Sequence, residues 1–389
     1  MDKRSFTLIN ILRNIVSIYF DTFFTIYFFK LVNYQILPLA KYYLVVFTVL
    51  PVSFWILKSA MKNNLKVANY RLGISFTAIY LALIMLLKDK IINYIYIVAI
   101  FKGLGDGFYY YPRNILNTEK ITNLERKHYD GLVNGINQIS NIIMPILLGL
   151  LIDKFTYVQI GKVVFILMIV IFILTFFVKE EKVKNKTSNM LEFIKKSLKE
   201  KDIRDIIILQ FLRGLTISSG VLTVVMTLYK INYFTTNTKI GSLNSILGLI
   251  TFIACLFYAS KIKKDVYKPI ILTTLVGVTI SLVTIGLKPN YQIMFIIYLV
   301  IYAFGVSIMS LLGDTIIANK SSNLFIKFNK EEYQLLLETV LGIARILGYI
   351  VLLIIGIIGV FLNLKYILFI SIIPLTLMSN ILIKNIDTI

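Results

Sequence analysis

A few ionisable residues lie inside long apolar segments of this sequence, where each could form an ion pair or carry a proton. They are Arg13, Asp21, Lys102, Asp106, Arg213, Glu338 and Arg345, with Asp314 at the edge of a segment. Burying one such charge alone in a membrane costs about 2.5–3.5 kcal/mol on insertion scales, so these residues normally face a partner or an aqueous cavity. Because four of them are cations and four are anions, the sequence favours pairing among them.

The depth of these charges predicts which ones pair. If the N-terminus lies inside the cell, Arg13 and Asp106 fall towards the inner side of two helices, while Asp21 and Lys102 fall nearer the middle. We therefore predict ion pairs of Arg13 with Asp106 and of Lys102 with Asp21. Lys102 and Asp106 are four residues apart on one helix face and could pair with each other instead.

The acidic residues are also candidates for proton coupling, because a carboxylate in a partly dry cavity can bind and release a proton. Asp21 and Glu338 are the first candidates and Asp106 is the third. Asp314, near the inner surface, is a candidate gating or structural residue. The alternative is that all four acids are permanent ion-pair partners.

The two remaining arginines have two possible roles. Arg213 and Arg345 could bind an anionic substrate, or they could neutralise Glu338.

Polar residues accompany the charges at spacings of three and four, which places each set on one face of a helix. Such a face must point into protein or water, so it either lines a cavity or holds helices together by hydrogen bonds. We favour the cavity, because two of the three sets contain full charges. The three sets are Asn10, Arg13, Asn14, Ser17, Asp21 and Thr25; Asn134, Asn137, Gln138 and Asn141; and Glu338, Gly342, Arg345 and Tyr349.

The elements that carry these residues are predicted to be membrane-spanning helices. Hydrophobic residues make up 58% of the 389 residues, charged residues only 16%, and the mean hydropathy is +0.81. The apolar blocks are roughly 20 residues long, as an α-helix needs to cross a bilayer. Twelve blocks are expected, at 6–29, 42–58, 68–87, 91–112, 131–152, 158–178, 206–229, 240–260, 269–287, 291–313, 334–357 and 364–383.

The distribution of basic residues indicates how the chain is oriented in the membrane. The net charge is +21, and 27 of the 41 Lys and Arg residues fall on the inner side when the loops are assigned alternately from an inner N-terminus. This bias follows the positive-inside rule and puts both termini in the cytoplasm. The positive charge therefore does not require nucleic-acid binding as its explanation.

Cys255 is the single cysteine, so no intrachain disulfide is possible. No metal-ligand spacing and no catalytic Ser-His or Cys-His set is found, so we expect no cofactor and no enzyme.

The chain divides into two halves that repeat each other. A charged linker at 179–204, which could contain an amphipathic helix on the inner leaflet, separates an N-terminal six-helix bundle at 1–178 from a C-terminal one at 205–389. A shift of 200 residues places "ILRN" at 11–14 on "FLRG" at 211–214 and Gly105 on Gly305. Two parallel six-helix repeats are the arrangement of major facilitator transporters.

The sequence resembles the major facilitator superfamily in topology along the whole chain and in local motifs that are only partly retained. The loop "LKSAMKNNLKV" at 57–67 keeps the basic residues of the family's loop between spans 2 and 3 but lacks its acid. In span 4, Gly105 and Gly107 fit the family's Gly-x-Gly, with Lys102 one residue later than the family's arginine. In span 5, Ser140, Pro145 and Gly149 retain part of a pattern that is typical of exporters.

This resemblance implies an all-α membrane protein of twelve helices in two pseudo-symmetric bundles, acting as a monomer in the cytoplasmic membrane. The richness in Ile, Lys and Asn suggests a bacterial source. It implies a secondary transporter that moves a small molecule by alternating access, and we predict proton-coupled efflux of amphipathic or hydrophobic compounds. The gating candidates are Pro145, Gly149, Gly105 and Gly107, together with Asp314. Two alternatives stay open: uptake of a small polar metabolite, and a non-transporting scaffold or immunity-type protein with this fold.

Overall fold

The computed structural model describes residues 2–61, 65–120, 123–179, 199–216, 221–260, 264–324, 330–358 and 364–386, and every element in them is a helix. The first half contains α1 (Asp2–Ile18), η1 (Tyr19–Phe24), α2 (Thr25–Leu31), α3 (Ile36–Met61), α4 (Lys66–Leu87), η2 (Lys88–Tyr94), α5 (Ile95–Lys120), α6 (Asn123–Phe155), α7 (Tyr157–Leu174) and η3 (Thr175–Phe177). The second half contains α9 (Lys201–Thr216), α10 (Val221–Tyr233), α11 (Asn237–Ala259), η4 (Lys264–Val266), α12 (Tyr267–Leu287), α13 (Gln292–Ile301), η5 (Tyr302–Val306), α14 (Ser307–Leu324), α15 (Lys330–Ile358) and α16 (Leu364–Lys384).

The prediction of an all-α membrane protein is confirmed. Among the described residues, nine helical stretches are long and apolar enough to cross a bilayer. One of them, Lys66–Asn117, is 52 residues long and contains α4, η2 and most of α5. The first predicted span corresponds to α1, η1 and α2, and the seventh to α9 and α10; neither is among the nine.

The first span is not a uniform α-helix. Its residues Tyr19–Phe24 form a π-helical segment, in which each turn takes up more residues than in an α-helix. A polar stripe that follows α-helical spacing up to Ser17 therefore changes direction at Asp21.

Helix α5 is longer than its predicted span, which ended at Pro112. The helix continues through this proline to Lys120. A proline inside a helix removes one backbone hydrogen bond, and in membrane helices neighbouring helices and local adjustment compensate for that loss. The longer helix brings Arg113 into the same element as Lys102 and Asp106.

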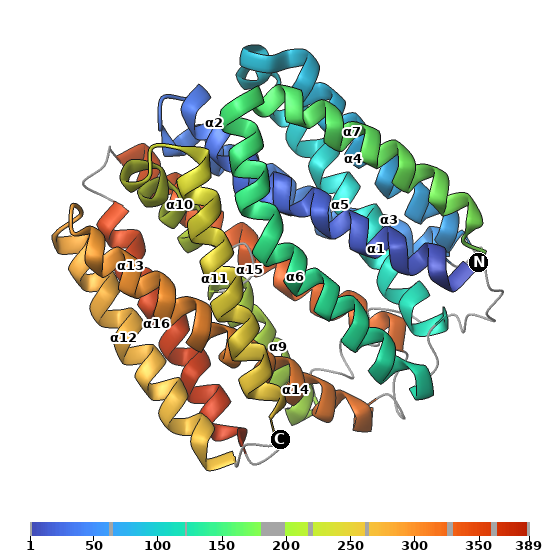
Figure 1. The fold of residues 1–389 in the computed structure, drawn as a ribbon. Helices are drawn as coiled ribbons and strands as arrows, with labels where there is room; N and C mark the ends of the chain where they lie inside the picture. The colour runs from blue at the N-terminus through green and yellow to red at the C-terminus, as the bar shows by residue number, and fades with distance from the viewer. Residues whose placement is uncertain are drawn as a thin grey trace. The chain divides into compact units, whose positions relative to one another are not determined.

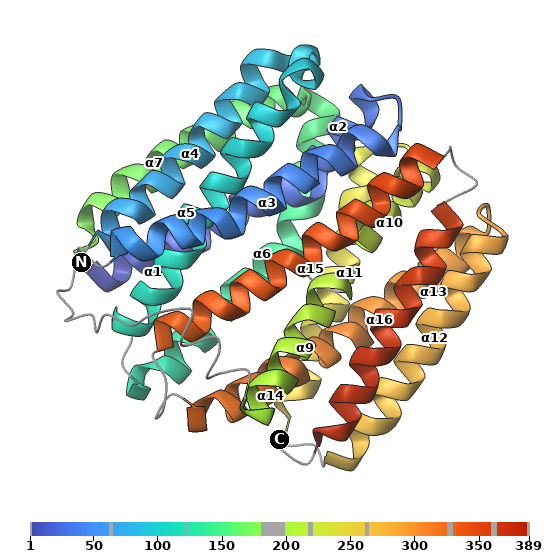
Figure 2. The same ribbon diagram turned by 180° about the vertical axis from the view of Figure 1, so that it is seen from behind.

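Small residues bring the helices of the first unit close together. Helix α4 packs on α5 and α7, α3 packs on α5, and α1 packs on α6 and α7, as both views of the ribbon show (Figures 1 and 2). A Cβ atom at Gly103 or Gly107 would collide with α3, and one at Gly105 would collide with Thr77 of α4. The alternating glycines of α5 therefore fit two different neighbours, one on each side.

The second half repeats this packing. Helix α9 packs on α15 and α16 as α1 packs on α6 and α7, and α12 packs on α16 as α4 packs on α7. Gly305 lies against Thr274 of α12, just as Gly105 lies against Thr77 of α4. The repeat that the sequence predicts is thus present in the contacts of the helices, and the two bundles are pseudo-symmetric.

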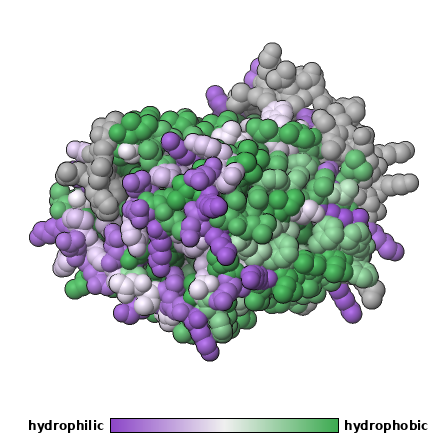
Figure 3. Space-filling model, turned by 90° about the horizontal axis from the view of Figure 1, so that it is seen from above, coloured by the Kyte–Doolittle hydropathy of each residue, from purple (hydrophilic) through white to green (hydrophobic). Residues whose placement is uncertain are grey.

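By compactness the chain forms two units, residues 1–186 with 230–246, and residues 187–229 with 247–389. The end of α10 and the start of α11 therefore group with the first unit. The predicted amphipathic helix in the 179–204 linker falls mostly at 180–198, outside the described residues, so it stays a prediction, as do the domain boundaries at 178 and 204. Hydrophobic side chains cover much of the face drawn in Figure 3, as expected of a surface in contact with lipid.

Candidate functional site

The centre of the first unit contains one carboxylate shared by two cations. Asp106 Oδ1 lies 3.1 Å from Arg13 Nη2, and Asp106 Oδ2 lies 2.8 Å from Lys102 Nζ. The side chains are buried, with exposed fractions of 2% for Arg13, 13% for Lys102 and 12% for Asp106. A second donor group of Arg13, Nη1, reaches Ser17 Oγ at 3.1 Å.

Of the two predicted ion pairs, the one between Arg13 and Asp106 is confirmed. Lys102 does not form its predicted ion pair with Asp21 and takes the alternative partner four residues away, Asp106. Asp21 lies within the π-helical segment Tyr19–Phe24. Asp21 is exposed, and it interacts with Lys102, Asp106 and Arg13 only through longer-range electrostatics.

We call Arg13, Asp21, Lys102 and Asp106 the charge cluster; its formal charge is zero when both acids are ionised. Aromatic rings surround its cations. Lys102 Nζ lies 5.5 Å from the centre of the Phe20 ring, and the Arg13 guanidinium lies 5.2 Å from that of Tyr109. Each contact adds a cation–π attraction at a place from which bulk water is largely excluded.

A second polar centre surrounds Asn10, which is 4% exposed. Its side-chain oxygen accepts hydrogen bonds from Tyr109 at 3.0 Å, Arg113 at 3.2 Å and Tyr70 at 3.4 Å. Its amide nitrogen donates to the Tyr129 hydroxyl at 3.3 Å. One side chain of α1 thus holds α4, α5 and α6 together.

Sequence reasoning missed the partners of Asn10, although a signal for them was present. Lys102, Asp106, Tyr109 and Arg113 follow one another at spacings of four, three and four, which is one face of a helix. Extending the charged face of α5 through Pro112 would have placed Tyr109 and Arg113 beside α1.

The predicted stripe on α6 is less packed than the charge cluster. Asn134 is exposed, and Asn137 and Asn141 are partly buried. A Cβ atom at Gly135 would meet no heavy atom within 4 Å, so the face is open beside Asn134. The side-chain oxygen of Asn137, by contrast, is buried and has no hydrogen-bond partner in the described part of the chain. The stripe is therefore open at one end and packed further along α6.

The second unit pairs the arginine that corresponds to Arg13 in the repeat. Arg213 Nη1 lies 2.7 Å from Asp314 Oδ1, and Arg213 Nη2 donates to Ser310 Oγ at 3.3 Å. The position equivalent to Asp314 in the first half is 114, eight residues beyond Asp106, or about 12 Å along the helix. The two pairs thus join equivalent helices at different depths.

The other acid of the second unit lies on α15. Glu338 Oε1 accepts a hydrogen bond from Gln334 Nε2 at 3.0 Å and interacts electrostatically with Arg345 and Arg213. The structure therefore places Glu338, Arg345, Arg213 and Asp314 in one unit and the charge cluster in the other.

The gating candidates of α6 lie against the start of α11. A Cβ atom at Gly149 would collide with the backbone of Asn237, and one at Gly241 would collide with the backbone of Pro145. Ile146 N donates to Ser245 Oγ at 3.2 Å, one residue after this proline.

A carboxylate closes the same junction. Asp153 Oδ1 accepts from Asn237 N at 3.1 Å and Nδ2 at 2.7 Å. Asp153 Oδ2 accepts from Thr238 N at 2.7 Å and Oγ1 at 2.6 Å. These donors include two free N–H groups at the N-terminus of α11, which a carboxylate satisfies well. We call these contacts of Asp153, Gly149 and Gly241 the α6–α11 clamp. Asp153 was not among the predicted site residues, because it lies just beyond the apolar block 131–152.

The chain resembles known proteins in sequence. A family model described as Major Facilitator Superfamily matches residues 70–348. An uncharacterized protein from the sodM 3′ region of Geobacillus stearothermophilus is 27% identical over 134 residues, which are 34% of this chain and 62% of that protein. The uncharacterized protein YqgE of Bacillus subtilis is 23% identical over 256 residues, which are 65% of this chain and 59% of that protein.

Solved structures share the fold. The nucleoside transporter NupG has a TM-score of 0.71 at 11% identity, covering 98% of both chains. A bacterial homologue of the iron transporter ferroportin, in an inward-facing state, has a TM-score of 0.68 at 14% identity, covering 98% of this chain and 97% of that one. With the family model spanning most of the sequence, these findings show that the chain belongs to the Major Facilitator Superfamily of membrane transport proteins.

Proposed function

We propose that this protein is a secondary active transporter that exports small amphipathic or hydrophobic compounds in exchange for protons. It acts as a monomer in a bacterial cytoplasmic membrane, with both termini in the cytoplasm. The observation that carries the proposal is that the two acids of the charge cluster differ in ion pairing and exposure. Asp106 forms ion pairs with both Arg13 and Lys102, whereas Asp21 is exposed and interacts with these cations only through longer-range electrostatics.

Asp21 is therefore the group that can exchange a proton. When it is ionised the cluster is neutral, and when it is protonated the cluster carries one positive charge. A cationic amphipathic compound is attracted by ionised Asp21 and repelled by the protonated state. Proton and substrate then compete for one group, which is the requirement for exchange. The buried rings of Phe20 and Tyr80 lie beside Lys102 and keep water from that side of the cluster.

The polar groups of the second unit have a supporting role. Glu338 has one neutral partner, Gln334, and two arginines at longer range. It is the second candidate for proton exchange. Arg213 and Asp314, by contrast, form a direct ion pair with the acid largely exposed, and we assign them a gating role.

The α6–α11 clamp supplies a second gating element. Alternating access needs a contact that forms and breaks without large rearrangement of the helices. The clamp consists of hydrogen bonds to one carboxylate and of glycine contacts, both of which can separate as rigid surfaces. We propose that it closes the outer side of the transport path and opens when substrate is released.

Purified protein in proteoliposomes tests this function. An imposed pH gradient should drive movement of a lipophilic cation such as tetraphenylphosphonium, and Asp21→Asn should abolish that dependence on the gradient. Asp89→Asn is the matched control, because Asp89 is an exposed acid in η2 between α4 and α5. Gradient-driven uptake of a polar metabolite, with no movement of amphipathic compounds, would favour the import alternative. Absence of flux for every compound class would favour a scaffold.

A further inference from the structure

A pocket of about 230 Å³ lies in the first unit. It is lined by residues of η1 and α2, by the end of α6 and by the beginnings of α7 and α11. None of its lining residues belongs to the charge cluster. In the topology proposed above, it faces the outer side of the membrane. The volume is below the roughly 300–1,000 Å³ typical of pockets for drug-sized ligands, so the pocket suits a smaller molecule.

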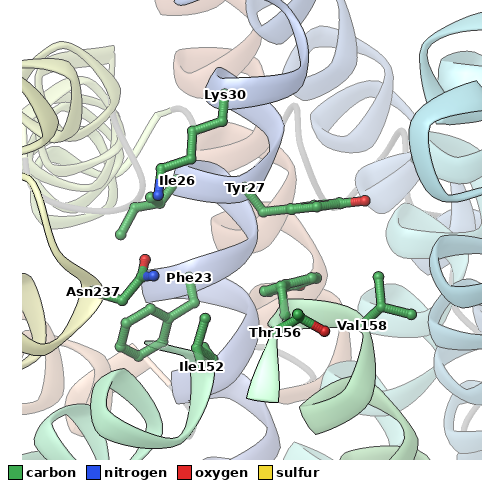
Figure 4. Close-up of a pocket in the computed structure, with 9 residues that line it drawn as sticks. Phe23, Ile26, Tyr27, Lys30, Ile152, Thr156, Val158 and Asn237 are labelled. Carbon is green, nitrogen blue, oxygen red and sulfur yellow. The ribbon is translucent and has the colours of Figure 1, made fainter. Parts of the chain in front are cut away.

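The walls of the pocket are apolar and partly flat. Phe23, Ile26, Ile152 and Val158 line it together with Tyr27 (Figure 4). All of these except Tyr27 and Val158 are buried. Such walls favour a ligand with an apolar body.

Three stacked tyrosines fix the aromatic part of the wall. Tyr157 lies between Tyr19 and Tyr27, with ring centres 4.7 Å and 4.5 Å apart and planes within 14° and 9°. Tyr19 also donates from its hydroxyl to the carbonyl oxygen of Tyr157 at 2.9 Å. Tyr27 is therefore held on a rigid support while part of its surface remains exposed, which favours stacking with a flat ring.

The pocket has one cationic side chain, that of Lys30. Within the described residues, Lys30 forms no ion pair and its ammonium group makes no hydrogen bond. Figure 4 shows this ammonium group on the same side of the pocket as Asn237 and Ile26. The nearby acid of the clamp, Asp153, is occupied by its four hydrogen bonds to the start of α11. A ligand with a negative group is the partner that this arrangement lacks.

The polar rim of the pocket is preorganised. Asn237 is fixed by Asp153 through both its backbone and its side-chain nitrogen. Thr156 is held at a φ of 88°, which is strained for a β-branched residue, and its side chain caps Gln159 N at the start of α7. A rim that is already rigid costs little ordering entropy when a ligand binds.

We propose that this pocket binds a small amphipathic anion with a flat apolar body, such as an aromatic carboxylate. The ring stacks on Tyr27 against the apolar wall, and the carboxylate pairs with Lys30. Because Asn237 lines the pocket and also belongs to the α6–α11 clamp, the bound anion stabilises the closed clamp. Binding at equilibrium does not require proton exchange at Asp21, so failure of the pocket and failure of the transport function are distinguishable.

Equilibrium dialysis of 1-naphthoate against the full chain in phosphatidylcholine nanodiscs tests the pocket, with empty discs subtracted. Saturable binding at one site is expected, weakened about tenfold or more by Lys30→Met, because a charge-assisted contact is lost. The neutral analogue 1-naphthylmethanol should bind more weakly and be insensitive to this substitution. Lys162→Met is the matched control, since Lys162 is an exposed lysine of α7 outside the pocket.

The outcomes that overturn the proposal are distinct. Absence of saturable naphthoate binding to the wild type, or equal binding to the Lys30→Met variant, contradicts an anion site at Lys30. Equal affinity for 1-naphthylmethanol shows that the charge is not recognised. Loss of naphthoate binding in discs that contain phosphatidylglycerol assigns the cation to a lipid headgroup and not to a soluble ligand. Because Lys30 is exposed, its substitution should leave the folding of the bundle intact.

Discussion

Replacing Asp106 by Asn should be the most destabilising single change in the charge cluster. The substitution keeps the shape of the side chain and removes its charge, leaving Arg13 and Lys102 buried without their common partner. Removal of one partner of a buried ion pair typically costs about 3–5 kcal/mol. At roughly 2–4 °C per kcal/mol for a unit of 150–250 residues, the unfolding midpoint should fall by roughly 6–20 °C.

The second unit provides the matched control for this change. Asp314→Asn removes the partner of Arg213, the arginine equivalent to Arg13 in the repeat, but the Asp314 side chain is 58% exposed. Exposed ion pairs contribute only about 0–1 kcal/mol, so this variant should unfold within a few degrees of the wild type. The chemistry of the substitution is the same in both variants, and burial is the difference.

The assay must follow both units. Loss of helical circular dichroism on heating reports the whole bundle, and labelling of the partly buried Cys255 in α11 by a thiol-reactive dye reports the second unit. A double-mutant cycle of Arg13→Gln and Asp106→Asn should show a coupling free energy above about 1 kcal/mol, as residues in one ion-pair network do. If Asp106→Asn and Asp314→Asn lower the midpoint equally, or if the cycle is additive, the cluster is not held together as described.

Two further changes test the helix contacts. Gly149→Ala places a methyl group against the backbone of Asn237 and should impair both transport and the stability of the α6–α11 clamp. Gly135→Ala, on the same helix in open space, should be neutral. Equal flux and equal unfolding midpoints for the two variants would contradict the clamp. Asn10→Leu leaves the buried hydroxyls of Tyr70 and Tyr109 and the partly buried Arg113 without their acceptor, and it should lower the free energy of unfolding by about 1–3 kcal/mol in the same thermal assay. A change within the error of the measurement would exclude Asn10 as a structural centre.

Much of the fold followed from the sequence because membrane physics leaves few choices. The lengths of the apolar blocks fixed the helices, and the repeat of Arg13 at Arg213 and of Gly105 at Gly305 predicted two equivalent bundles, which the packing of the helices shows. The ion pair of Arg13 with Asp106 followed from depth alone, since a buried charge must find a partner at its own level.

The parts that could not be predicted depend on local backbone geometry. The π-helical segment at Tyr19–Phe24, which contains Asp21, has no clear sequence signal. The clamp at Asp153 depends on the distance between α6 and the N-terminus of α11, which periodicity does not contain. The extension of α5 through Pro112 was concealed because proline usually ends a soluble helix, whereas neighbouring helices support it here.

The most direct test of proton exchange at Asp21 is the flux of tetraphenylphosphonium in proteoliposomes, measured with and without an imposed pH gradient for the wild type, Asp21→Asn and Asp89→Asn. Proton exchange at Asp21 predicts gradient-driven flux in the wild type and in Asp89→Asn, and flux independent of the gradient in Asp21→Asn. Gradient-driven flux that survives in Asp21→Asn would contradict it.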